Sequence, residues 1–156
     1  MGFFIEEFVG DFMETRPIAV VVDDSKPFLM YLSLLLDRMN LEVLPVNNTA
    51  EAIEISRVTR PSLITMDMMM PGMDGLETLK RIKESHPDAE IIMLSGQGTV
   101  RTSIEAMKLG AEDFLEKPVD LQELLKKIDE MKTKRILVLE KQSMEEIEQI
   151  LKRKAW

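Results

Sequence analysis

The sequence predicts an α/β fold in which five parallel strands alternate with helices. Short apolar runs, several of them rich in valine and isoleucine, recur along the chain without polar alternation, which is typical of strands covered on both faces. Amphipathic stretches separate these runs, and strands that alternate with helices form a parallel sheet. Acidic residues and a lysine follow several runs, at the edge where parallel sheets bind ligands.

Five apolar runs are the expected strands. In chain order they are residues 18–22 (IAVVV), 41–46 (LEVLPV), 62–66 (SLITM), 90–94 (EIIML) and the weaker 113–116 (DFLE). Each is short enough to be a strand rather than a buried helix.

The stretches between the strands show helical spacing and helix-end residues. Pro27 suits a first helical turn, and apolar residues recur after it up to Met39. Asp74 and Asp120 each precede a periodic apolar stretch and have a glutamate three residues later, which indicates a helix N-terminus. Gly110 is expected to end the helix before the fifth strand.

The N-terminal end precedes the repeating unit. We expect residues 17–131 to form the domain and residues 1–16 to form an N-terminal extension. Phe4, Phe8 and Phe12 recur every four residues, which predicts an amphipathic helix. Alternatively, translation naturally starts at Met13, and residues 1–12 are not part of the natural protein.

The C-terminal end, residues 132–156, is expected to be a helical tail. It either continues the last helix of the domain or adds another helix, for which Ser143 and Glu146 would form a capping box. The segment RILVLE (135–140) is also compatible with a strand, so this alternative stays open.

The composition limits the classes of partner. The chain is 45% hydrophobic and has no cysteine, which excludes a disulfide scaffold or a thiolate zinc site and fits a reducing, cytoplasmic environment. Its net charge is −8, with −11 over residues 1–131 and +3 over residues 132–156. An acidic body repels nucleic acid, and no apolar run reaches the ~20 residues that span a membrane.

A set of polar residues follows the expected strands. Asp23 and Asp24 follow the first strand, Asp67 the third, Ser95 the fourth and Lys117 the fifth. Three carboxylates at one edge repel one another unless a cation joins them, and Mg²⁺ prefers such oxygen ligands. Three carboxylates, one Mg²⁺ and one lysine sum to zero charge. The sequence therefore predicts a magnesium site at this edge.

These motifs together resemble the receiver domain of two-component response regulators. The matching elements are Asp23-Asp24, the segment from Asp67 to Gly75, Ser95-Gly96 and Lys117-Pro118, in the family's order and at its spacing. The resemblance covers about residues 17–131. It implies a flavodoxin-like, doubly wound (βα)5 fold with strand order 2-1-3-4-5.

The resemblance also implies roles for the acidic residues. Asp67 would be the phosphoacceptor. Asp24, Asp67 and the backbone carbonyl of Met69 would ligate magnesium, and Asp23 would act largely through a bound water.

Further roles are implied around the phosphoryl group. Lys117 would pair with one of its oxygens, and Ser95 would donate a hydrogen bond to another and move with Phe114 as a switch. Phe114 is equally compatible with a simple core position. Met69 and Gln97 occupy the positions that orient the hydrolytic water, but Met69 has no useful polar group.

The function implied is a phosphoacceptor switch that catalyses only its own phosphorylation and dephosphorylation and uses Mg²⁺. Its partners would be a sensor histidine kinase or phosphotransfer protein and a downstream protein, with a homodimer as one option, and neither nucleic acid nor membrane.

Two alternatives remain. The chain is a receiver segment of a longer transcription factor or hybrid kinase, or it is a magnesium-dependent phosphatase with an aspartyl nucleophile. Such phosphatases place DxD after the first strand, whereas this chain has DDS.

Two remaining residue types receive structural interpretations. The only histidine, His86, precedes Pro87 at an expected helix end, and we expect it at the surface. The methionines around Asp67 are expected to fill gaps in the core and loop rather than to bind a metal.

Overall fold

The computed structural model describes residues 16–70, 74–96 and 99–154, except for the side chains of residues 135, 136 and 139. The predicted N-terminal amphipathic helix and the alternative start at Met13 lie outside these ranges. The chain forms two compact units, Met1–Val119 and Asp120–Trp156. The first unit contains the sheet, and the second contains a single long helix.

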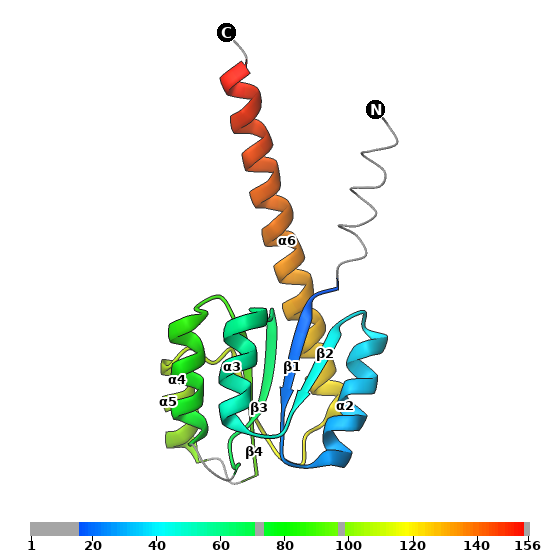
Figure 1. Cartoon of the computed structure of the whole chain (residues 1–156), viewed down its shortest axis with the longest axis vertical. Coiled ribbons are helices and arrows are strands. Elements are labelled where there is room, and N and C mark those ends of the chain that lie inside the picture. Colours follow the sequence, from blue (N-terminus) through cyan, green and yellow to red (C-terminus); the bar gives the residue numbers. More distant parts are fainter. Residues whose placement is uncertain (1–15, 71–73, 97–98, 155–156) are drawn as a thin grey trace. The chain divides into compact units, whose positions relative to one another are not determined.

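The first unit is built on a five-stranded parallel sheet (Figure 1). The strands are β1 (Ile18–Val22), β2 (Glu42–Val46), β3 (Leu63–Asp67), β4 (Glu90–Ser95) and β5 (Asp113–Glu116). Their order is β2-β1-β3-β4-β5. The predicted fold class, strand number and strand order are confirmed.

The central strands are apolar because helices cover both faces of the sheet. All five residues of β3 are buried, as are the last five of β4, whereas the edge strands β2 and β5 are partly exposed. In the register, Asp67 pairs with Leu94 and Ser95 pairs with Glu116. The ends of β3, β4 and β5 are therefore level with one another.

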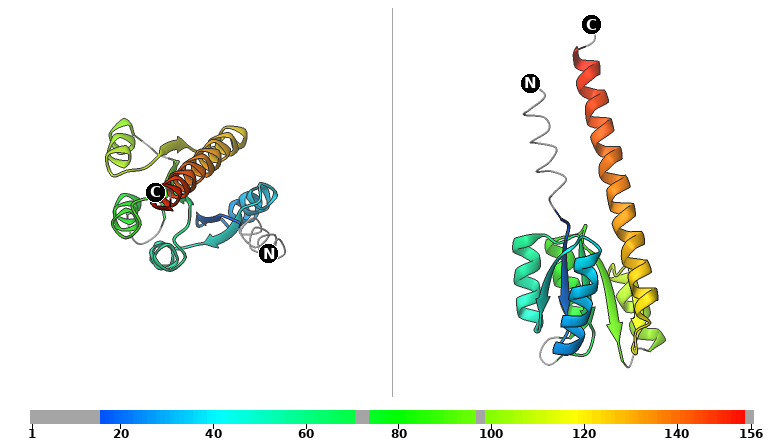
Figure 2. Two further views of the ribbon diagram at one scale, coloured as in Figure 1. Left: turned by 90° about the horizontal axis from the view of Figure 1, so that it is seen from above. Right: turned by 90° about the vertical axis from the view of Figure 1, so that its right-hand side faces the viewer.

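Four helices connect these strands: α2 (Lys26–Arg38), α3 (Thr49–Thr59), α4 (Gly75–Ser85) and α5 (Val100–Lys108). Helices α3, α4 and α5 lie side by side on one face of the sheet, and α2 lies on the other face (Figure 2). The apolar side of α2 is buried through Leu29, Leu32 and Leu36.

Side-chain caps fix the helix starts. Ser25 accepts a hydrogen bond from the backbone of the first turn of α2, and Asn48 does the same for α3. Asp74 caps α4 by accepting from the backbone N–H of Leu76. Gly110 follows α5 with φ = +103°, a left-handed conformation that favours glycine, and it ends the helix as predicted.

The prediction that His86 lies at the surface is wrong, because its side chain is only 4% exposed. It follows the end of α4, where its Nε2 lies 2.9 Å from the carbonyl oxygen of Pro61. Its Nδ1 lies 3.4 Å from a guanidinium nitrogen of Arg60. These two partners belong to the loop between α3 and β3, so the histidine joins two loops that are distant in sequence.

The second unit is the helix α6 (Leu121–Lys154). It runs without interruption through the RILVLE segment, so the strand alternative is wrong, and no new helix begins at Ser143. Asp120 accepts hydrogen bonds from the backbone of Gln122 and Glu123, which confirms the predicted start. None of the described helices combines the length and hydropathy needed to cross a bilayer.

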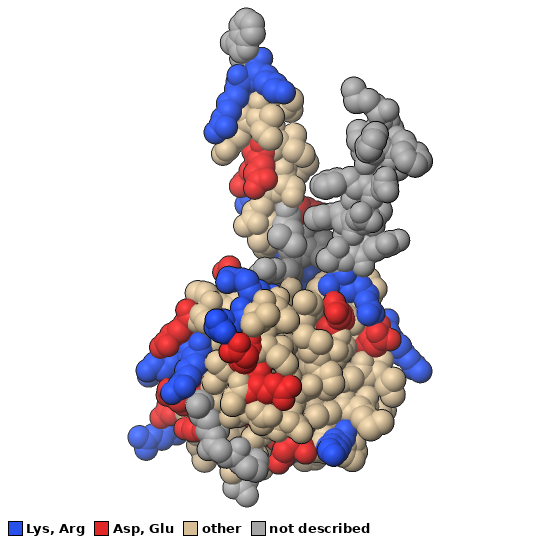
Figure 3. Space-filling view, in the orientation of Figure 1, with Lys and Arg blue, Asp and Glu red and all other residues tan. Residues whose placement is uncertain are grey.

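Charge is distributed differently in the two units (Figure 3). On the visible face of the first unit, acidic and basic side chains are interspersed around an uncharged area. Along α6, the acidic residues Glu145, Glu146 and Glu148 precede the basic end Lys152–Lys154. On the first unit, no single-sign patch of the kind that binds nucleic acid is visible on this face.

Candidate functional site

The predicted site residues lie at the carboxyl ends of the strands. Asp23 and Asp24 directly follow β1, Asp67 ends β3, Ser95 ends β4 and Lys117 directly follows β5. In a parallel sheet these ends share one edge, and the loops beyond that edge form the ligand site. The structure thus brings together residues that are up to 94 positions apart in the chain.

Three carboxylates form the centre of the site. Asp23, Asp24 and Asp67 each offer an oxygen, and these oxygens all lie within 4.8 Å of one another. Asp23 is fully buried and Asp67 is 4% exposed, whereas Asp24 is exposed. Burying two like charges so close together is unfavourable unless cations compensate them.

Lys117 supplies part of that compensation. Its Nζ lies 3.0 Å from Oδ2 of Asp23 and 3.1 Å from Oδ2 of Asp67. The lysine side chain is 28% exposed, so the ion pairs are only partly screened by water. One positive charge against three carboxylates leaves a formal charge of −2 in the cluster.

The other oxygens of the buried carboxylates accept backbone hydrogen bonds. Oδ1 of Asp23 accepts from the N–H of Ser25 at 2.8 Å, and Oδ1 of Asp67 accepts from the N–H of Met69 at 3.1 Å. The side chain of Asp24, by contrast, has no hydrogen bond or ion pair within the described residues. Asp24 is therefore the carboxylate with both oxygens available to a ligand.

The pKa values follow from burial and pairing. Burial raises the pKa of Asp67, and the hydrogen bonds from Met69 and Lys117 only partly oppose this effect. Burial alone would lower the pKa of Lys117, but its bonds to Asp23 and Asp67 outweigh burial and raise it. Lys117 is consequently charged at neutral pH, and Asp67 pays a desolvation cost whenever it is charged.

The donor set fits a hard divalent cation. Carboxylate oxygens are the ligands that Mg²⁺ takes in proteins, together with backbone carbonyls and waters. A +2 ion would cancel the remaining charge of the cluster, and Asp24 has no competing partner among the described residues. The described residues of the site thus fit magnesium on both chemistry and charge.

The remaining predicted residues border this cluster. Ser95 is buried, and its backbone carbonyl accepts a 2.7 Å hydrogen bond from the N–H of Lys117. Phe114 is half-buried and packs against the core. Met69 is 59% exposed, and Gln97 lies outside the described residues. The peptide bond between Lys117 and Pro118 is cis.

Sequence reasoning missed one side chain at the site. The ring centroid of Phe28, in the first turn of α2, lies 5.4 Å from Nζ of Lys117. A phenylalanine in an amphipathic helix gives no chemical signal of its own. Only its position, four residues after Asp24, indicates from the sequence that Phe28 lies near the site.

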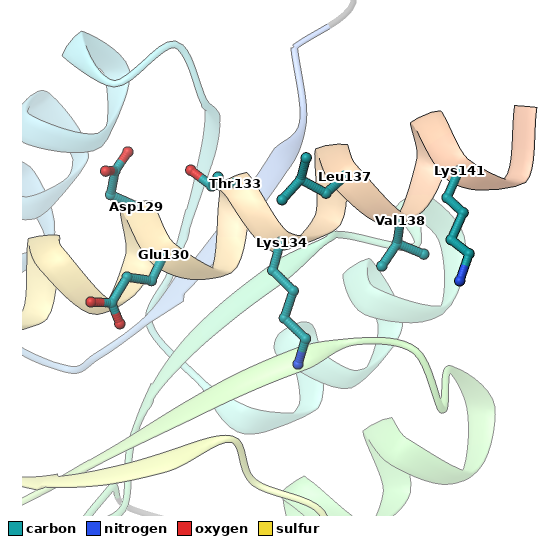
Figure 4. Close-up of a pocket in the computed structure, with 7 residues that line it drawn as sticks. All are labelled: Asp129, Glu130, Thr133, Lys134, Leu137, Val138 and Lys141. Atoms are coloured by element: carbon teal, nitrogen blue, oxygen red, sulfur yellow. The ribbon is translucent and has the colours of Figure 1, made fainter. Parts of the chain in front are cut away.

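A pocket of about 480 Å³ is lined by seven residues of α6 (Figure 4). They are Asp129, Glu130, Thr133, Lys134, Leu137, Val138 and Lys141. None of them belongs to the predicted site. The apolar Leu137 and Val138 lie between charged neighbours along the helix, so this surface suits a protein contact better than catalysis.

The comparison with known families matches one family model. The model of the response regulator receiver domain matches residues 19–129. The chain is 37% identical over 111 residues to the chemotaxis protein CheY of Bacillus subtilis, a match that covers 70% of this chain and 92% of that protein.

Other relatives are longer. A protein-glutamate methylesterase/protein-glutamine glutaminase of Archaeoglobus fulgidus is 36% identical over 148 residues, which cover 88% of this chain and 42% of that protein. Four curated relatives, this one included, are matched over only 25 to 59% of their lengths.

Solved structures agree with the fold. A response regulator receiver domain from Clostridium thermocellum superposes with a TM-score of 0.72 at 31% identity. The match covers 78% of this chain and 98% of that one.

Proposed function

The chain belongs to the response regulator receiver family, and on that basis we propose that it accepts a phosphoryl group on Asp67 from a histidine kinase or phosphotransfer protein. The observation that carries the proposal is the cluster of Asp23, Asp24 and Asp67 within 4.8 Å, bridged by Lys117. Receiver domains act as phosphoacceptor switches, and this cluster has the groups such a switch needs.

The proposed reaction is phosphoryl transfer between two nucleophiles. A carboxylate oxygen of Asp67 forms a bond to phosphorus while the bond from phosphorus to the donor's imidazole nitrogen breaks, and that nitrogen keeps the electron pair. Charge then spreads over the three other phosphoryl oxygens. Lys117, whose ammonium lies 3.1 Å from Asp67, pairs with one of these oxygens, and Ser95 donates a hydrogen bond to another.

Magnesium would be held by Asp24, Asp67 and the backbone carbonyl of Met69, with Asp23 acting through water. When bound, the ion neutralises negative charge on the transferring group. The hydrogen bonds of Asp23 agree with its indirect role, since one of its oxygens is held by Lys117 and the other by the backbone of Ser25. Asp24→Ala should accordingly weaken magnesium binding more than Asp23→Ala in titration calorimetry. The reverse order would refute this division of roles.

Output requires that phosphorylation change the surface. In the proposed switch, Ser95 moves toward the phosphoryl group and Phe114 changes rotamer. Phe114 is half-buried on β5, next to Met93 of β4. The partner of the phosphorylated protein would be a downstream protein rather than nucleic acid or a membrane. The proposed location is the cytoplasm, with which the absence of cysteine also agrees.

The direct test is phosphorylation by a small donor. Acetyl phosphate with Mg²⁺ should add one phosphoryl group to the protein, and Asp67→Asn should abolish the addition. Intact-mass spectrometry measures the gain, and peptide mapping locates it. Equal labelling of the Asn variant would refute Asp67 as the acceptor.

A second candidate is that this receiver acts as one part of a longer protein. The 148-residue match to the methylesterase favours it, because that alignment covers 88% of this chain but 42% of the relative. In that case phosphorylation at Asp67 would control an attached activity. The complete reading frame and an assay of phosphorylated full-length protein would separate the two.

We also propose that α6 contacts a second copy of the chain. Beyond Met131 none of its described side chains is buried. The exposed apolar residues Leu137, Met144 and Leu151 recur every seven positions. This spacing is typical of helices that pair along one face.

A further inference from the structure

Lys117 has a third partner beside its two carboxylates. Its Nζ lies 5.4 Å from the centroid of the Phe28 ring, within the distance at which an ammonium is attracted to an aromatic face. The lysine side chain is only 28% exposed, which strengthens such a contact relative to one in open water.

The backbone around Phe28 connects the ring to the same acidic cluster. Phe28 donates its N–H to Oγ of Ser25 at 3.4 Å, and Ser25 donates its own N–H to Asp23 at 2.8 Å. Asp23 in turn accepts from Nζ of Lys117 at 3.0 Å. The contacts form a closed cycle, so the start of α2 is fixed relative to the ammonium it covers.

Phe28 is not needed to anchor α2 in the core. Leu29, Leu32 and Leu36 are the buried residues of this helix, whereas Phe28 is half-buried. Its ring is therefore available at the edge of the site. A leucine would satisfy helix packing equally well, but it has no negative face for an ammonium.

We propose that Phe28 is a positioning residue for Lys117, whose ring covers one side of the ammonium and holds it against Asp67; this inference rests on the proposed phosphoryl transfer. A lysine side chain is flexible, and its ammonium is strongly hydrated. Shielding one side of the ammonium from water restricts the positions of Nζ. It also strengthens the electrostatic attraction between the ammonium and a phosphoryl oxygen.

The kinetic test compares variants that keep or remove the aromatic face. Phosphorylation by acetyl phosphate is followed over a range of donor concentrations, and the maximal rate is separated from the half-saturating concentration. Phe28→Leu should lower the maximal rate about fivefold, the equivalent of about 1 kcal/mol. Phe28→Tyr should stay within twofold of wild type. Leu34→Ala, an exposed position on the same helix, is the matched control.

A structural measurement accompanies the kinetics and needs no phosphorylation. In the unmodified protein, the aromatic ring should shift the NMR signals of the Lys117 ε-methylene upfield. Phe28→Leu should return these signals to the range of exposed lysines, and Phe28→Tyr should retain the shift.

The outcomes separate this inference from the proposed function. If wild-type protein takes no phosphoryl group, the proposed function fails and the positioning role fails with it. If wild type reacts at Asp67 but Phe28→Leu reacts equally fast, only the positioning role is refuted. Equal losses in the Leu and Tyr variants, or no ring shift at Lys117, would also refute it.

Discussion

At the residue scale, the buried carboxylate of Asp67 lowers the stability of the fold and is also the proposed nucleophile. Its carboxylate is 4% exposed, and its only cationic partner in the described residues, Lys117, is shared with Asp23. Burial raises its pKa, so the charged form that can act as a nucleophile is also the form that costs folding free energy. A bound divalent cation would remove that cost.

Asp67→Asn should therefore stabilise the magnesium-free protein at pH 7. We expect a gain on the order of 1 kcal/mol, or about 2–4 °C in the unfolding midpoint, because the amide keeps the shape without the charge. Thermal unfolding with chelator measures it, and Asp88→Asn is the control for removing an exposed carboxylate. Added Mg²⁺ should raise the midpoint of wild type and have less effect on Asp67→Asn. A variant less stable than wild type under chelation would contradict this account.

The same substitution makes a prediction about pH. A raised acid pKa means that the folded state binds a proton more readily than the unfolded state, whose reference value is 3.8. The contribution of Asp67 to stability therefore falls as pH rises from the pKa of the unfolded state to the higher pKa of the folded state. The advantage of Asp67→Asn should be full at pH values above the raised pKa of the folded state and should shrink as pH falls from there toward 3.8. A constant difference across that range would show that charge burial is not its cause.

Met69 concerns the lifetime of the phosphoryl group. Its side chain is 59% exposed next to Asp67, and a thioether can orient water only weakly. We expect a moderately long-lived phosphoprotein. Met69→Asn should speed its decay about tenfold, the effect of one hydrogen bond of about 1.4 kcal/mol in the transition state.

The decay of phosphoprotein after removal of the donor is the measurement, and Met30→Asn, an exposed change on α2, is the control. Gln97→Ala should slow decay by a similar factor. If neither Met69→Asn nor Gln97→Ala changes the rate, other groups orient the water.

At the scale of elements, the start of α4 is packed against the strand end that carries Asp67. A Cβ at Gly75 would lie 2.9 Å from the backbone oxygen of Met68, closer than real contacts allow. Gly75→Ala should destabilise the fold by about 1–3 kcal/mol, because backbone atoms cannot move aside as a flexible side chain can. Urea denaturation measures the change in the free energy of unfolding.

Gly96 provides the matched control for that prediction. A Cβ there would meet no atom of the described residues within 4 Å, so Gly96→Ala should change stability by no more than about 0.5 kcal/mol. Equal effects at the two glycines would show that crowding against Met68 is not the cause.

The elements themselves were largely predictable. Buried parallel strands are continuous apolar runs, and Asp74 and Asp120 mark helix starts by their side-chain chemistry, so the sheet and these starts follow from the sequence. Ser143 and Glu146 have the same local pattern, yet α6 continues through them. A capping pattern only starts a helix where the preceding chain is not already helical.

Side chains that contact distant segments were not predictable. His86 is polar and next to a proline, and only the fold reveals that Arg60 and Pro61 surround it. Phe28 reaches Lys117 across 89 positions of sequence for the same reason. The acidic cluster could be predicted because its residues follow a general rule, that ligands bind at the carboxyl ends of parallel strands. No such rule predicts the contacts of His86 and Phe28.

At the scale of the whole molecule, α6 is a long helix with an exposed apolar stripe. We define this stripe as Leu137, Met144, Ile147 and Leu151, all at least half exposed. Single exposed apolar residues are common, but a row at spacings of seven, three and four is the pattern of a helix that pairs with another. Glu140 interrupts the row and Lys154 follows its last residue, so we expect a weak pair that depends on concentration.

The last prediction tests whether the stripe binds a second copy of the chain. Ile147→Glu combined with Leu151→Glu should convert a concentration-dependent dimer into a monomer in light scattering, because each adds a charge to the apolar row. Gln142→Glu with Gln149→Glu adds the same charge on the opposite face of α6 and should leave the dimer intact. Deleting residues 133–156 should act like the stripe variant and leave labelling at Asp67 unchanged. A wild-type protein that stays monomeric at all concentrations would refute the pairing, and loss of the dimer in both double variants would indicate a charge effect rather than a contact through the stripe.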